Sequence, residues 1–104
     1  MDNNLEMTIM QLITCGGDVR GKAIEAIRTA RNGDFEKADK LLIESEEALV
    51  EAHQYQTNLL FQESSGNSVP FSILLLHAED HIMNAMTVKE LAAEIIENLR
   101  KAVK

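Results

Sequence analysis

One stretch of the chain, LLLHAEDHIM at positions 74–83, gathers the residues that could do chemistry. His77, Asp80 and His81 stand within five positions of one another, in a run that is otherwise rich in Leu, Ile and Met. On an α-helix, at about 100° per residue, the two histidines lie one turn apart on the same flank, and Asp80 lies about 60° from His77. An imidazole, a carboxylate and a second imidazole are therefore predicted to line one wall of a helix.

Two kinds of chemistry fit this wall. A neutral imidazole is a nucleophile when its other ring nitrogen is held as a hydrogen-bond donor, and partial desolvation favours the neutral ring. His77 is the candidate nucleophile, and His81 and Asn84 are the nearest candidate donors along the same flank. Asp80 carboxylates from symmetric copies could instead share an oxygen-preferring cation such as Mg²⁺ or another divalent ion.

Three rival interpretations of the stretch fit the residues less well. Histidines at i and i+4 can chelate a metal, but HAEDH has neither the HExxH nor the HxxEH order of helical zinc proteases. A histidine phosphotransfer domain of a two-component relay usually carries Lys and Gly soon after its histidine, whereas Asp80 and His81 follow here. A non-catalytic helical oligomerisation module explains the apolar residues but leaves His77 without a role.

Composition and charge argue against several classes of function. Ten basic and 17 acidic residues give a net charge of −7, which repels a phosphate backbone, so we expect no nucleic-acid partner. The longest apolar run spans only the four positions 73–76, so we expect no membrane insertion. The N-terminus lacks a basic segment before an apolar core, and Cys15 is the one cysteine; both favour a reduced, cytoplasmic setting.

Helices must position these residues. The chain has 104 residues, 45% of them apolar and 4% aromatic, with one Pro and no alternating run, which predicts a single all-α domain over 1–104. Two breaks predict three helices at about 3–31, 34–63 and 69–103. Short connections would fold them into an antiparallel up-down-up bundle.

Local signals mark the helix ends. Gly33 can end the first helix in the left-handed conformation, and Asp34 can cap the second. Pro70 fits the first turn of the third helix, with Ser68 as its cap. Inside the first helix, the pair Gly16-Gly17 lowers helix stability, and we interpret it as a tolerated weak point or a slight kink.

The third predicted helix is apolar on two sides. One side is a core stripe of ten residues: Phe71, Leu75, Ala78, Ile82, Ala85, Val88, Ala92, Ile95, Leu99 and Ala102. The side opposite Ala78 carries Ile73, Leu76, Asp80, Met83 and Thr87. A helix that is apolar on both sides is buried on both sides, and the chain offers no fourth helix. We therefore expect self-association through this helix, with Asp80 inside the interface.

The motifs now in view closely resemble the enzyme IIA component of the lactose/cellobiose (diacetylchitobiose) branch of the bacterial sugar phosphotransferase system. The resemblance rests on LLLHAEDHIM, on MTVKELAAEII after it and on GDFEKADKLLIESEEALVEAHQYQT before it, and it covers about residues 7–99. It implies a three-helix bundle that forms a homotrimer with the third helices near the axis. It also implies phosphoryl transfer for the uptake of a β-disaccharide such as lactose or cellobiose.

Residue roles follow from the same resemblance. His77 would accept a phosphoryl group from the histidine-containing phosphocarrier protein and pass it to a cysteine of enzyme IIB. His81 would lie near the phosphorylated ring. Asp80 of each subunit would bind a structural divalent cation at the trimer centre. The family commonly has Gln where this chain has Glu79, which at about 200° from His77 is expected to point elsewhere.

Overall fold

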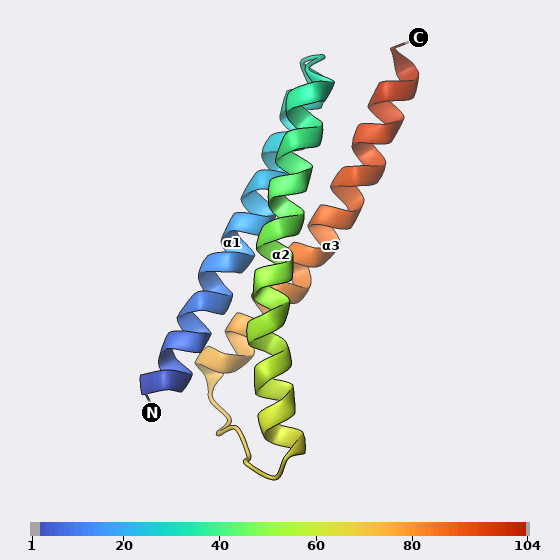
Figure 1. The fold of residues 1–104 in the computed structure, drawn as a ribbon. Helices are drawn as coiled ribbons and strands as arrows, with labels where there is room; N and C mark the ends of the chain where they lie inside the picture. Colours follow the sequence, from blue (N-terminus) through green and yellow to red (C-terminus); the bar gives the residue numbers. More distant parts are fainter. Residues whose placement is uncertain (1–2, 104) are drawn as a thin grey trace.

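The computed structural model describes residues 3–103, which form three long α-helices (Figure 1). They are α1 (Asn3–Arg31), α2 (Phe35–Ser64) and α3 (Ile73–Ala102). The chain runs up through α1, down through α2 and up again through α3, in a rod of 55 × 20 × 19 Å. The described residues contain no strand, so the predicted all-α, up-down-up bundle is confirmed. Among these helices, none is apolar enough over its length to cross a bilayer.

The turn between α1 and α2 has the structure that the sequence predicts. Gly33 adopts a φ of +91°, which L side chains rarely tolerate, and its N–H donates to the Ala30 carbonyl at 2.9 Å. The Asp34 side chain then accepts a hydrogen bond from the Lys37 N–H at 3.1 Å, which caps α2. The predicted roles of Gly33 at the end of α1 and of Asp34 as the cap of α2 are therefore both confirmed.

The predicted start of the third helix at residue 69 is wrong, because α3 begins at Ile73. Its N-cap is Ser72, not Ser68: the backbone of Ser72 is extended, and its Oγ accepts a hydrogen bond from the Leu75 N–H at 3.0 Å. Pro70 remains in the preceding loop. Val69 keeps that segment out of the helix, since its side chain packs against the core and its N–H donates to Glu63 Oε1 at 3.3 Å.

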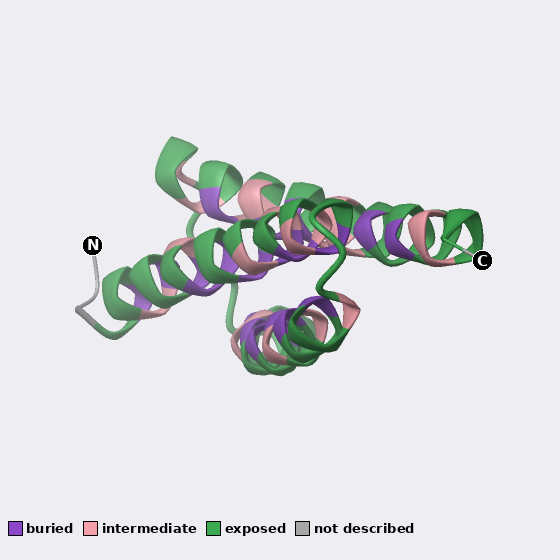
Figure 2. Ribbon diagram, turned by 90° about the horizontal axis from the view of Figure 1, so that it is seen from above, coloured by how far each residue is buried: buried purple, intermediate pink, exposed green. Residues whose placement is uncertain are grey.

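The core lies along the lines where α1 meets the other two helices. Figure 2 shows the buried residues on the inward sides of the helices and exposed residues around the outside. In α3 the predicted core stripe is confirmed at four fully buried residues: Ala78, Ile82, Ala85 and Ala92. Three members of the predicted stripe are wrong: Phe71 precedes the helix and is 77% exposed, Ile95 is 42% exposed, and Ala102, the last residue of α3, is also exposed.

Ile96 takes the place of Ile95 in the core, with an exposed fraction of 1%. The predicted stripe advances by 3.5 residues per turn, whereas an α-helix has 3.6 residues per turn. After several turns the buried line has therefore moved on by one residue. The same drift leaves Ile95 beside the core rather than in it.

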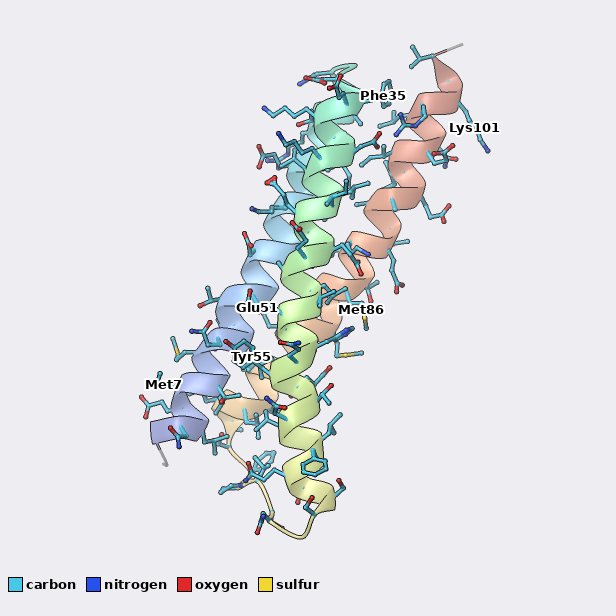
Figure 3. The ribbon with its side chains drawn as sticks, in the orientation of Figure 1. Met7, Phe35, Glu51, Tyr55, Met86 and Lys101 are labelled. Atoms are coloured by element: carbon cyan, nitrogen blue, oxygen red, sulfur yellow. The ribbon has the colours of Figure 1, made fainter. Side chains whose placement is uncertain are left out.

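Side-chain contacts also tie α3 to α2. Arg100 Nη2 lies 2.6 Å from Asp39 Oδ1, and its guanidinium carbon lies 5.1 Å from the centroid of the Phe35 ring. Figure 3 shows Phe35 at the start of α2, on the side that faces the C-terminal end of α3. Lys89 pairs with Glu46 nearer the middle of the bundle. These contacts lie along the side of α3 that faces α2.

The revised start of α3 can be tested with two serine substitutions. Ser72→Ala removes the acceptor for the Leu75 N–H and should lower the free energy of unfolding by about 1 kcal/mol. Ser68→Ala is the matched control, and because Ser68 lies in the exposed loop it should change stability much less. Urea unfolding followed by circular dichroism measures both. An equal or larger loss in Ser68→Ala would contradict the observed cap.

Candidate functional site

The two histidines of the 74–83 stretch lie side by side on α3. The His77 and His81 rings are nearly parallel, with 14° between their planes and 6.1 Å between their centroids. His77 is exposed, whereas His81 is half-buried. His77 is therefore the ring that another protein can reach, and His81 is the ring that the bundle holds.

The His81 ring packs against the Gly16-Gly17 pair of α1. A β-carbon built on Gly16 would lie 2.7 Å from His81 Cδ2, and one on Gly17 would lie 3.8 Å from His81 Nε2. The pair is therefore more than the tolerated weak point that we expected, because it leaves room for an imidazole. Glycine inside a helix often has such a packing reason, but the sequence does not say which residue of α3 fills the space.

Asp80 and Asn84 form a second pair, one turn apart on the outer side of α3. Asn84 Nδ2 donates a hydrogen bond to Asp80 Oδ2 at 3.2 Å, and both residues are exposed. The structure thus places Asn84 against the carboxylate. The predicted hydrogen bond from Asn84 to a phosphate on His77 would have to use the second hydrogen of the amide nitrogen, because the first is donated to Asp80.

The apolar surface around Asp80 is uncovered in the single chain, as predicted. Ile73, Leu76 and Met83 are 74%, 54% and 47% exposed. Ile73 and Leu76 form a shallow hollow together with His77 and Asp80. The candidate nucleophile therefore stands at the edge of an exposed apolar surface that has a carboxylate in its middle.

Glu79 points away from the two histidine rings. Its Oε2 accepts a hydrogen bond from Gln56 Nε2 of α2 at 2.6 Å. This contact confirms the orientation expected from helix geometry. The extra negative charge at this position is thus held between α2 and α3.

The other candidate ligands and nucleophiles lie apart from this pair. Burial raises the pKa of the Cys15 thiol, and the carboxylates of Glu51 and Asp18 raise it further, so Cys15 stays protonated in the core. His53 is exposed on α2. Within residues 3–103, no three His, Cys, Asp or Glu side chains gather so as to hold a metal ion.

Known proteins resemble this chain over almost its whole length. The family model described as PTS system, Lactose/Cellobiose specific IIA subunit matches residues 7–100. A lichenan-specific phosphotransferase enzyme IIA component from Bacillus subtilis (strain 168) is 48% identical over 101 residues, which are 97% of this chain and 92% of that protein.

Solved structures agree with the family model. The crystal structure of the cellobiose-specific enzyme IIA from Bacillus anthracis superposes with a TM-score of 0.94 at 43% identity, covering 98% of this chain and 94% of that one. The IIA(Chitobiose) protein of Escherichia coli, solved in complex with HPr, superposes with a TM-score of 0.85 at 35% identity, covering 99% of this chain and 100% of that one. The chain therefore belongs to the family of lactose/cellobiose-specific IIA subunits of the sugar phosphotransferase system.

Proposed function

We propose that this protein is a cytoplasmic phosphocarrier that takes a phosphoryl group on His77 from the histidine-containing phosphocarrier protein, HPr, and gives it to a cysteine of enzyme IIB. The observation that carries the proposal is the exposed His77 ring stacked beside the held His81 ring on the family's motif. The complex of the E. coli relative with HPr supports the choice of donor. Relatives named for lichenan, cellobiose and chitobiose support a β-linked saccharide as the final acceptor.

The transfer step is a displacement at phosphorus. The lone pair of one His77 ring nitrogen forms an N–P bond while the N–P bond of phospho-HPr breaks, and the donor imidazole leaves with that electron pair. Each ring keeps the proton on its other nitrogen, so no external base is needed. A cysteine thiolate of enzyme IIB then forms a P–S bond as the N–P bond on His77 breaks. Catalysis in such steps depends mainly on positioning and on stabilising charge.

We assign to His81 the stabilisation of the phosphoryl oxygens. Its half-buried ring is nearly parallel to His77, with 6.1 Å between the centroids, so a ring N–H can donate to an oxygen of the group on His77. Asn84 is a possible second donor through the amide hydrogen that does not bond Asp80. Glu79 stays out of the site because its carboxylate is bonded to Gln56.

A homotrimer through α3 would cover the exposed apolar surface of the single chain. Ile73, Leu76 and Met83 are exposed on the side of α3 that also carries Asp80, so a partner packed on this side would remove them from water. Around a threefold axis, three Asp80 carboxylates would repel one another unless a cation or a proton joined them. Carboxylate oxygens suit Mg²⁺ or another divalent cation, which would have a structural role and would lie apart from the phosphate.

Phosphorylation of His77 can be read as a change in intact mass. Wild-type protein incubated with phosphoenolpyruvate, enzyme I and HPr should gain one acid-labile phosphate, and His77→Ala should gain none. His53→Ala is the matched control, because His53 is exposed on α2, and it should gain phosphate as the wild type does. No gain in the wild type with active partners would favour the non-catalytic oligomerisation module.

The proposed structural role of Asp80 can be tested by its effect on trimer assembly, without measuring phosphoryl transfer. Asp80→Leu replaces clustered carboxylates by apolar contact, so the trimer should persist in EDTA and tighten by roughly 1–4 kcal/mol, as seen when buried charges are replaced. Wild-type trimers should dissociate more readily in EDTA than in Mg²⁺. Sedimentation velocity over a range of protein concentrations measures both. A monomeric Asp80→Leu protein would disprove the axial placement of Asp80.

A further inference from the structure

We propose that Gly16 is a positioning residue for phosphoryl transfer. Because Gly16 has no side chain, the His81 ring fits against α1 and is held there beside His77. The inference rests on the proposed role of His77, and it adds a residue of α1 to a site that otherwise belongs to α3. It also assigns a purpose to a glycine in the middle of a 29-residue helix.

The contact at Gly16 is closer than any β-carbon could tolerate. A β-carbon there would lie 2.7 Å from Cδ2 and 3.4 Å from Cγ of His81, and 3.2 Å from Cδ1 of Ile82. Gly16 itself is buried, and Ile82 is fully buried in the core between the helices. The backbone of α1 cannot move away freely, because α1 packs against both α2 and α3.

A methyl group at Gly16 would therefore act mainly on His81. The Ile82 contact involves the tip of a flexible side chain, which can give by a few tenths of an ångström. The His81 ring is half-buried, so it can turn toward solvent. Turning it would change the 14° interplanar angle and the 6.1 Å centroid separation that relate it to His77. The empty space at Gly16 thus sets where the ring nitrogens of His81 lie.

The same helix provides a matched control. A β-carbon built on Gly21 meets no atom within 4 Å, and Gly21 is exposed. Alanine should strengthen α1 at either position, because glycine is a poor helix former. Gly21→Ala should therefore raise the urea midpoint of unfolding without touching the site, while Gly16→Ala adds the collision with His81.

The rate of phosphoryl transfer from phospho-HPr to His77, measured by rapid quench and intact mass, tests the proposal. We expect Gly16→Ala to slow the transfer by about tenfold to a hundredfold, since small displacements of a positioned group have effects of this order. Gly21→Ala should transfer at the wild-type rate. In a His81→Ala background, Gly16→Ala should cause little further loss, because the two residues act through the same ring.

A second measurement reports the ring position without any phosphoryl transfer. The chain has three histidines, so the imidazole resonances in a nuclear magnetic resonance spectrum of the labelled protein can be assigned. Gly16→Ala should shift the His81 resonances and leave those of His53 on α2 in place. Gly21→Ala should shift neither.

The possible outcomes distinguish a failure of this inference from a failure of the proposed function. Equal transfer rates in Gly16→Ala and Gly21→Ala, unshifted His81 resonances, or an undiminished effect of Gly16→Ala in the His81→Ala background would overturn it. A wild-type protein that gains no phosphate would instead overturn the role of His77. If Gly16→Ala does not fold, the double variant Gly16→Ala/His81→Ala should fold. An unfolded double variant would show that the collision is not with His81.

Discussion

The close packing of α3 against α1 is the contact on which the rest of the structure depends. Ala78, Ile82 and Ala85 have no exposed surface, and they fix which side of α3 faces the bundle. Once this side is fixed, the remaining directions around the helix follow from its geometry. His81 falls beside α1, His77 falls at the margin, and Asp80 falls on the outer side. The packing of this side of α3 therefore determines how exposed each of its polar residues is.

A phosphocarrier needs such an arrangement, because its nucleophile must meet two partner proteins in turn while its surroundings stay fixed. Under the proposed function, the exposed His77 would provide the access, and the half-buried His81 would provide a donor that does not have to be ordered at each transfer. The exposed apolar surface around Asp80 is the part of α3 through which we propose that copies of the chain join. The proposed phosphoryl transfer and the proposed assembly would thus use adjacent flanks of one helix.

Much of this could be predicted from the sequence, because helix periodicity and end signals are local. Asp34 caps α2 as its position suggests, and Asp80 lies opposite Ala78 as the angles require. The start of α3 could not be predicted, since Ser68 before Pro70 is as good a local signal as Ser72, and the packing of Val69 decides between them. The role that we propose for Gly16 could not be predicted either, because it depends on which residue of another helix lies opposite.

The location of the phosphate on the wild-type protein tests the central claim most directly. Protein phosphorylated through HPr can be kept above neutral pH, where phosphohistidine survives, and fragmented by electron transfer in a mass spectrometer. The chain has three histidines, and fragments between them distinguish His53, His77 and His81. The account predicts phosphate on His77 alone. Phosphate on His81 or His53 would contradict it, because the exposed ring at the margin of α3 would then not be the carrier.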